Sequence, residues 1–288
     1  MMKLYGSIEG GGTKFVCAIG NEQLEVIEKV VFKTTSPEET LDKVIQFFEN
    51  KPVEAISMGM FGPLENRQGH AKYGYITNTP KQGWQNVDVV RIVTKKLKQP
   101  LYFTTDVNAS AYGEFIIRNT EAGLVYYTIG TGIGAGIVLN GELIGVTGHP
   151  EMGHVTIKRT PEDADFAGIC PYHQDCLEGL ASGPTLEARL GVRGEDIPKD
   201  HPVYAQISNY IAQACVQSTL TFRPNQIVLG GGVMDPHLLA CIKKEFQRIL
   251  NNYIEIDDID HYLSLPCAAE NGSATVGNFA LAKKMLEK

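Results

Sequence analysis

The sequence predicts an α/β fold built from two similar halves, and three observations support this prediction. Short apolar runs that end in glycine alternate with longer segments that have helical apolar spacing. A pattern of strand, glycine loop, strand and hairpin occurs near the N-terminus and returns about half a chain later. Strands mixed with helices in this way are typical of partly parallel sheets with helical cover. The repeat indicates duplicated halves rather than one continuous sheet.

The first half begins with three successive strands over residues 4–32, which are separated by the loop EGGGT and the turn GNEQ. Helical apolar spacing follows over 37–50, and a buried strand is predicted over 54–62. The pattern then predicts a helix over 87–98, a strand over 101–106 and a helix over 107–118.

The second half repeats the strand pattern, with strands predicted over 124–130, 135–139 and 142–146. Strand and loop return over 225–235, and helices are predicted over 182–190, 202–222, 235–253 and 273–288. We therefore expect an N-terminal α/β domain over residues 1–115, with helix 273–288 packing back on it. A C-terminal α/β domain over 116–272 would contain a candidate metal-binding loop.

Composition excludes several classes of protein. The 288 residues are 43% hydrophobic and 20% charged, as in soluble globular proteins. A net charge of −7 without a run of basic residues argues against nucleic-acid binding. The sequence has no apolar stretch near the roughly 20 residues that a membrane helix needs, and its start lacks the apolar core of a signal peptide. We therefore expect a cytoplasmic protein. We also expect small core residues at Cys17, Cys215, Cys241 and Cys267.

Three glycine-rich loops follow predicted strands, at residues 9–14, 130–134 and 230–232. Any one of them alone is typical of an ordinary turn. Neither G-x-G-x-x-G before a helix nor G-x-x-x-x-G-K-[ST] occurs, which excludes the dinucleotide-binding and P-loop patterns. Glycine lets backbone N–H groups approach a phosphate closely. Because two of the loops lie at matching points of the repeat, together they favour a nucleotide held between the two halves.

The stretch CPYHQDC places Cys170, His173 and Cys176 within seven positions. A structural zinc site needs four ligands, and His154 is the nearest upstream histidine in a plausible motif. A disulfide would be unusual in a reducing cytosol, and redox chemistry is disfavoured because C-x-x-C is absent. The spacing therefore favours zinc.

Asp106 stands at the carboxyl end of a predicted strand, directly before a helix. Functional carboxylates are often found at this position in open α/β sheets. By position alone, however, Asp106 or Asn108 is better explained as a helix cap.

The stretches EGGGTKF, YTIGTGIGAGIVLNGELIGVTGHPEMGHV and CPYHQDCLEG resemble the ROK family of sugar kinases, and above all its bacterial fructokinase branch. The match covers nearly the whole chain in the right order. The resemblance implies a duplicated actin-like, ribonuclease-H-like ATPase fold, with ATP and sugar in a cleft between two domains. It also implies a homodimer.

The resemblance assigns roles to residues on both halves. The ATP phosphates would face loop residues Gly11, Gly12, Thr13, Lys14, Thr131 and Gly132, and the adenosine would lie near Gly231 and Gly232. Glu9 stands where many relatives carry an Asp that helps to hold Mg²⁺ through water.

The catalytic and sugar-binding residues are implied in the same way. Asp106 matches the family's catalytic aspartate, and Thr105 stands where relatives often have Asn, so one neighbouring sugar contact is expected to differ. The expected sugar-binding residues are Glu151, His154 and Glu178, with Asn78 as a further candidate. Relatives bind zinc through one His and three Cys in this segment. Here the implied structural zinc set is His154, Cys170, His173 and Cys176, and the other ring nitrogen of His154 would be directed at the sugar.

The expected activity is ATP:hexose 6-phosphotransferase, with D-fructose converted to fructose 6-phosphate. Glucokinase and N-acetylhexosamine or mannose kinase activities stay open as alternatives. The family also includes sugar-responsive transcriptional repressors. These carry a helix-turn-helix domain before the first glycine loop, whereas here that loop begins at Glu9.

Overall fold

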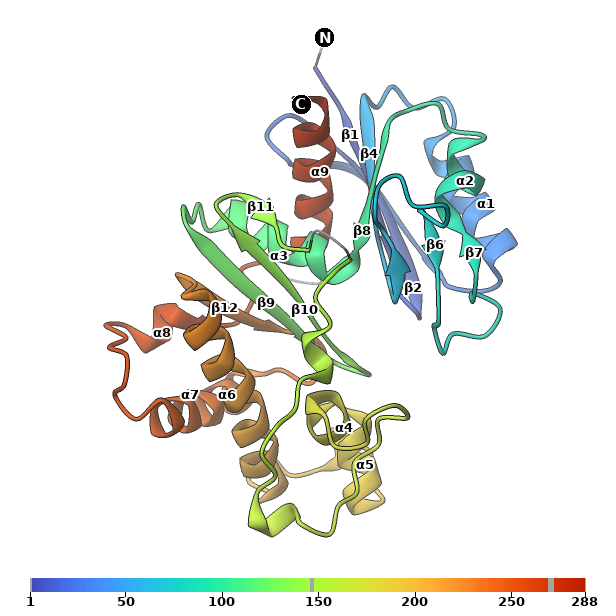
Figure 1. The fold of residues 1–288 in the computed structure, drawn as a ribbon. Helices are drawn as coiled ribbons and strands as arrows, with labels where there is room; N and C mark the ends of the chain where they lie inside the picture. Colours follow the sequence, from blue (N-terminus) through green and yellow to red (C-terminus); the bar gives the residue numbers. More distant parts are fainter. Residues whose placement is uncertain (1, 146–147, 269–271, 288) are drawn as a thin grey trace. The chain divides into compact units, whose positions relative to one another are not determined.

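The computed structural model describes residues 2–145, 148–268 and 272–287. The chain forms two compact units, which we describe separately (Figure 1). The first unit contains Met1–Asn119, Leu143–His149 and Cys267–Lys288, and the second contains Thr120–Glu142 and Pro150–Pro266. The short segment 143–149 therefore belongs to the first unit, although the sequence boundaries place it with the second half.

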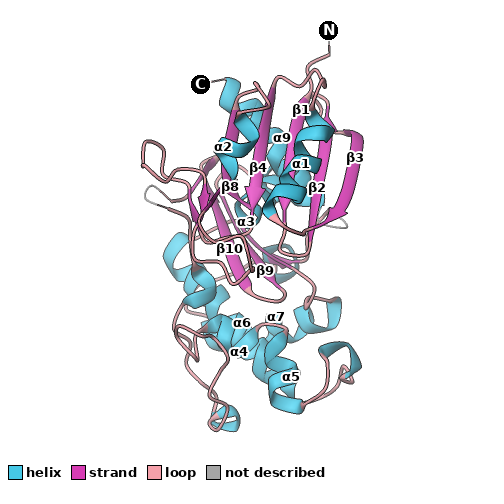
Figure 2. Cartoon of the chain, turned by 90° about the vertical axis from the view of Figure 1, so that its right-hand side faces the viewer, coloured by secondary structure: helices cyan, strands magenta, loops and turns pink. Residues whose placement is uncertain are grey.

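The first unit is built on a five-stranded sheet in the order β3-β2-β1-β4-β8. Its strands are β1 Tyr5–Gly10, β2 Lys14–Gly20, β3 Val26–Lys33, β4 Ala55–Met60 and β8 Leu101–Thr105. Strands β1, β4 and β8 are parallel, and β1, β2 and β3 are joined as antiparallel neighbours. Figure 2 shows β3, β2, β1 and β4 side by side.

Helices cover both faces of this sheet. One face packs against α1 Pro37–Phe48 and α2 Val89–Thr94, and the other against α9 Gly272–Leu286, which in turn contacts α3 Asp106–Ile117. Ser36 caps α1 by accepting the N–H of Glu39. Helices α3 and α9 approach very closely, because a Cβ at Gly277 would lie 1.8 Å from the carbonyl oxygen of Ala109. A small sheet of β5 Leu64–Glu65, β6 Tyr75–Ile76 and β7 Val87–Asp88 completes the unit.

The second unit repeats the strand order of the first, as β11-β10-β9-β12-β13. Its strands are β9 Gly123–Ile129, β10 Ile133–Leu139, β11 Glu142–Leu143, β12 Gln226–Gly230 and β13 Leu263–Ser264. As in the first sheet, the central strand has one antiparallel neighbour, β10, and one parallel neighbour, β12. The repeated order confirms the predicted duplication.

Long helices support the second sheet. Helix α6 Val203–Phe222 packs against α7 Pro236–Leu250, and the hydroxyl of Tyr127 on β9 lies 2.8 Å from that of Ser218 on α6. The remaining elements are α4 Leu177–Ala181, α5 Pro184–Leu190, α8 Ile259–Tyr262 and the 3-10 helices η1 Met152–His154, η2 Pro161–Asp163 and η3 Gly194–Asp196.

Most predicted elements are present, and the differences have local causes. The helix predicted over 87–98 begins later, because residues 87–88 pair with β6 as strand β7. The strand predicted over 142–146 forms only at Glu142–Leu143, and residue 146 lies outside the described residues. Cys17 and Cys215 are buried as predicted, but the prediction was wrong for Cys267, which is exposed, and Cys241 is only partly buried. Within the described ranges, no helix combines the length and apolarity needed to cross a membrane.

Candidate functional site

The carboxyl ends of the parallel strands bring candidate residues of the first unit to one edge of its sheet. The register pairs Gly10 with Met60, and Met60 with Thr105. Glu9, the loop after β1 and Asp106 therefore lie along the same edge, where ligands bind in open α/β sheets. Glu9 is buried within β1.

The loop over residues 11–14 is held by hydrogen bonds that leave its tip open. The N–H of Gly11 donates to the carbonyl of Lys14 over 3.0 Å. Thr34 braces the loop, since its N–H donates to Thr13 O and its hydroxyl to Gly11 O, over 2.9 and 2.7 Å. A Cβ at Gly12 would meet no atom within 4 Å. Packing within the protein therefore does not explain this glycine, whereas close approach of a ligand would.

Asp106 is the first residue of α3, but it is not the residue that caps the helix. The side chain of Thr105 caps α3 by accepting the N–H of Asn108 over 3.0 Å, so the cap interpretation of Asp106 and Asn108 was wrong. Asp106 Oδ1 accepts the N–H of Val107 over 2.9 Å. Burial raises the pKa of the Asp106 carboxyl to about 6, although this hydrogen bond and the nearby His149 act in the opposite direction. Near neutral pH the group is an ionised base, stronger than an ordinary aspartate.

His149 is a neighbour of this site that the sequence analysis did not single out. It lies in the short segment of the first unit between β11 and η1, and a Cβ at Gly62 would lie 3.6 Å from its Nε2. Only the fold brings it close to Asp106, so no spacing in the sequence points to it. Asn78 is exposed in the turn after β6, and its role in sugar binding stays a prediction.

In the second unit, the glycine loops after β9 and β12 pack against each other. The N–H of Val233 donates to Ile129 O over 3.0 Å. Gly231 has φ +96°, and a Cβ there would lie 2.4 Å from the same oxygen, so this position requires glycine. A Cβ at the adjacent Gly232 would meet nothing within 4 Å. The fold thus brings the loop that contains Thr131 and the loop that contains Gly232 together on one edge.

Glu178 on α4 is tied to the start of β10. Its Oε2 accepts the N–H of Ile133 over 2.8 Å, and a Cβ at Gly132 would lie 2.7 Å from that oxygen. Helix η1 packs on the same residue, because a Cβ at Gly153 would lie 1.8 Å from Ile133 O. Ile133 is therefore the point where Glu178 and the helix that ends at His154 meet.

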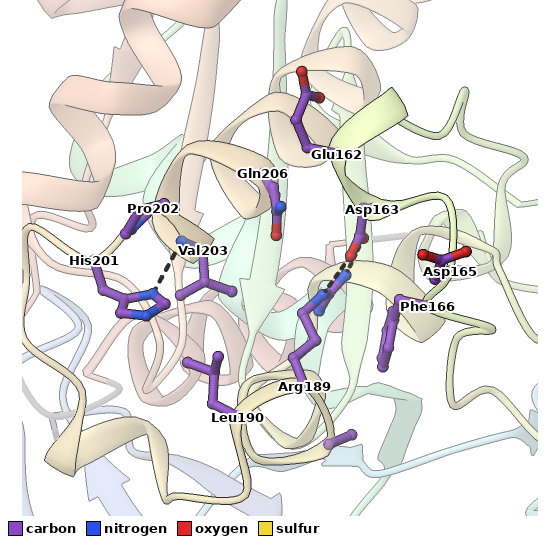
Figure 3. A pocket seen from close by; sticks show the side chains of 11 residues that line it. Glu162, Asp163, Asp165, Phe166, Arg189, Leu190, His201, Pro202, Val203 and Gln206 are labelled. Atoms are coloured by element: carbon purple, nitrogen blue, oxygen red, sulfur yellow. Dashed lines mark hydrogen bonds and ion pairs between the residues drawn. The ribbon is translucent and has the colours of Figure 1, made fainter.

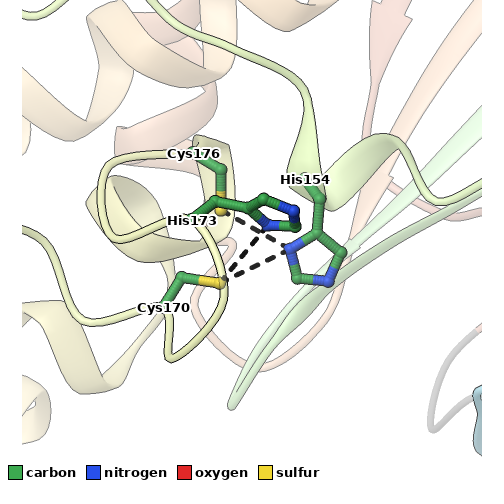
Figure 4. Close-up of side chains that lie close together, drawn as sticks. All are labelled: His154, Cys170, His173 and Cys176. Atoms are coloured by element: carbon green, nitrogen blue, oxygen red, sulfur yellow. Dashed lines mark hydrogen bonds between the residues drawn. The ribbon is translucent and has the colours of Figure 1, made fainter.

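His154, Cys170, His173 and Cys176 form one cluster (Figure 4). One nitrogen or sulfur from each lies within 4.8 Å of the others. His154 Nδ1 lies 3.5 Å from Cys176 Sγ and 3.7 Å from Cys170 Sγ, and Cys170 Sγ lies 3.7 Å from His173 Nδ1. Zn–S and Zn–N bonds of about 2.3 and 2.05 Å give nitrogen–sulfur edges of about 3.6 Å in a tetrahedron. The donor set and the spacing both fit zinc.

Backbone pairing, rather than regular secondary structure, forms this cluster. Cys170 and Gln174 exchange two N–H···O bonds of 3.2 and 2.9 Å, which close a tight loop around His173. A second bridge between Thr156 and Cys176 brings the chain after His154 beside the last ligand. Burial, with Cys170 beside it, raises the pKa of the Cys176 thiol to about 11. A bound cation would therefore be needed to hold it as a thiolate at neutral pH.

The candidate residues divide between the two units. Glu9, the 11–14 loop, Asn78 and Asp106 belong to the first, whereas Thr131, Gly132, Glu151, His154, Glu178, the cysteines, Gly231 and Gly232 belong to the second. Glu151 is exposed directly before η1, where its carbonyl accepts the N–H of His154 over 3.0 Å. A cavity of about 390 Å³ lies in the second unit, but none of the predicted site residues lines it (Figure 3).

Comparisons with known proteins agree with this fold. A model of the ROK family matches residues 5–285. A protein named fructokinase from Streptococcus mutans is 53% identical over 99% of both chains, and another from Lactococcus lactis subsp. cremoris is 52% identical over 100% of both. The crystal structure of a ROK hexokinase from Thermus thermophilus aligns with a TM-score of 0.79 at 24% identity, covering 99% of this chain and 100% of that chain.

Proposed function

Because the chain belongs to the ROK family, we propose that it is an ATP-dependent hexose kinase that converts D-fructose to fructose 6-phosphate. The observation that carries the choice of sugar is the high identity to two proteins named fructokinase over the whole length of both chains. The chemistry of the candidate residues supports a kinase, because it supplies a base and open glycine loops suited to phosphates.

In the proposed reaction Asp106 accepts the proton from the O6 hydroxyl of fructose. The O6 oxygen forms a bond to the γ-phosphorus of ATP, and the bond from that phosphorus to the β,γ-bridging oxygen breaks, which releases ADP. A pKa of about 6 suits this role, because the carboxylate is ionised at neutral pH yet basic enough to take a proton.

The glycine loops supply backbone N–H groups for the phosphates of ATP. Gly12 in the first unit and Gly232 in the second have open space where a side chain would project, which supports their assignment to the nucleotide. Mg²⁺ bound with ATP would neutralise charge on the phosphates, and Glu9 would hold it through water.

A structural zinc ion is the second part of the proposal. His154 Nδ1 faces both thiols, which leaves Nε2–H to donate to a sugar hydroxyl. Cys176 directly precedes α4, and Glu178 is the second residue of that helix. A metal that fixes Cys176 would therefore also limit the movement of α4. The cluster would thus hold in place two groups that bind fructose.

The substrate assignment is tested with a coupled ADP-release assay on fructose, glucose, mannose and N-acetylmannosamine, with and without Mg²⁺. We expect fructose to give the highest kcat/KM, by at least tenfold, and no turnover without Mg²⁺. A higher kcat/KM for another hexose would move the assignment to that sugar. The absence of ADP release with all four sugars would refute the kinase.

Asp106→Asn is expected to lower kcat by about 10²–10⁴-fold, since it removes the base.

In the wild type, log kcat/KM should fall with unit slope below pH 6, as Asp106 becomes protonated. The folded-state pKa is raised from 3.8 to about 6, so ionisation of Asp106 lowers stability as the pH rises through this range, by about 3 kcal/mol in all above pH 6. The Asp106→Asn variant should therefore be as stable as the wild type at pH 8, or more stable, in a thermal melt.

Asp88→Ala is the matched control, because Asp88 caps α2 by accepting the N–H of Arg91. It should lose about 1 kcal/mol of stability while activity stays near the wild-type value. The assignment of Asp106 fails if Asp106→Asn keeps its activity, or loses it only because the protein unfolds.

Gly232→Ala and Gly231→Ala form a matched pair for the nucleotide loop. The free energy of unfolding of Gly232→Ala should lie within about 0.5 kcal/mol of the wild-type value. Its KM for ATP should rise at least tenfold, while its KM for fructose should change little. Gly231→Ala should lose more than about 1 kcal/mol, because its φ and the Ile129 backbone exclude a methyl group. An unchanged ATP KM in Gly232→Ala would contradict the assignment of this loop to ATP.

A further inference from the structure

Helix α4 is too short to hold its own position. It spans five residues, Leu177–Ala181, directly after the Cys176 ligand, and it carries Glu178. Isolated helices of this length are not stable, so the helix depends on outside contacts. One contact is the hydrogen bond from the Ile133 N–H to Glu178 itself. The helix also packs against α6 and η1, and the carbonyl groups at its C-terminal end still lack partners within the helix.

Arg189 on α5 supplies one such partner. Its Nη2 donates to the carbonyl oxygen of Leu180 over 2.8 Å, and its Nη1 donates to Thr185 O over 3.2 Å. The same guanidinium holds the carboxylate of Asp163 through two bonds, Nε to Oδ1 over 3.0 Å and Nη2 to Oδ2 over 2.6 Å. One planar group therefore joins α4, α5 and η2.

The pair is buried and held by several neighbouring groups. The side chains of Arg189 and Asp163 are only 6% and 5% exposed. The hydroxyl of Tyr210, on the long helix α6, donates to Asp163 Oδ2 over 2.9 Å. The centroid of the Phe166 ring lies 3.9 Å from the guanidinium carbon (Figure 3). The ion pair thus adds a polar link between α4 and α6 to their direct packing, and the cavity of Figure 3 lies beside it.

We propose that Arg189, held by Asp163, is a positioning residue of the sugar site, which acts by fixing α4 and through it Glu178 and Cys176. This inference rests on the proposed kinase function. Lysine could not replace arginine here, because an ammonium group lacks the planar fork that serves the carboxylate and the Leu180 carbonyl together. Removing one partner alone would leave a buried charge, so the pair must also be tested by replacing both residues.

Two variants distinguish the effect of the guanidinium hydrogen bonds from the effect of the positive charge. Arg189→Lys keeps the charge opposite Asp163 but loses the fork. The double variant Asp163→Leu with Arg189→Met leaves no buried charge but also no donor to Leu180. Ile242→Val in α7 serves as a control for general loss of stability, because Ile242 is buried on a helix that packs against α6 and carries neither Arg189 nor Asp163.

Hydrogen exchange of residues 177–182 in the full-length protein is the first readout, because it requires neither zinc nor turnover. Both variants should exchange at least tenfold faster there than the wild type, while Ile242→Val should not. In both variants the KM for fructose should rise at least tenfold, while the KM for ATP should change less than twofold. Both variants should also release zinc to a colorimetric chelator at least tenfold faster than the wild type.

Wild-type exchange at 177–182 in both variants would overturn the proposal. So would faster exchange with an unchanged fructose KM, because Arg189 would then support the fold alone. Failure of the proposed function itself is recognised separately, since the wild type would then phosphorylate no sugar in the same assay.

Discussion

Between Glu151 and Glu178 the chain carries three of its candidate sugar-binding residues and all four candidate metal ligands on very little regular structure. This stretch contains the 3-10 helices η1 and η2 and the start of α4, with two isolated β-bridges. So few backbone hydrogen bonds cannot fix side chains to the accuracy that binding of sugar hydroxyls needs. Cross-links between distant residues must do so instead. The His/Cys cluster would be one such cross-link once it binds the proposed zinc, and the Arg189–Asp163 pair near the other end of α4 is the second.

In the first unit, by contrast, candidate residues lie at the carboxyl ends of buried parallel strands. Asp106 follows β8 and begins α3, so the sheet and the helix fix its backbone on both sides. The same burial raises its pKa, which costs stability when the group is ionised but makes it a better base. Because Thr105 caps α3, the carboxylate of Asp106 is not needed as the helix cap. The separation of these two tasks is consistent with a carboxylate kept for chemistry.

The sequence was informative wherever a local pattern determines the structure. Strand and glycine-loop repeats predicted both sheets, and the spacing of Cys170, His173 and Cys176 predicted the cluster that the fold assembles with His154. Features that depend on distant contacts were not predictable. Arg189 and Asp163 are 26 residues apart, and nothing in the local sequence distinguishes them from surface charges. His149 near Asp106 and the short strands β5–β7 were missed for the same reason.

We propose that a metal in the His/Cys cluster holds the fructose-binding groups in place, so its removal must weaken sugar binding. It is tested most directly by calorimetric titration of fructose into protein that holds one zinc per chain, and into the same preparation after zinc is removed with a chelator. We expect zinc removal to weaken fructose binding at least tenfold and added zinc to restore it. Equal affinity in the two samples, or protein purified without chelator that contains no zinc, would contradict it.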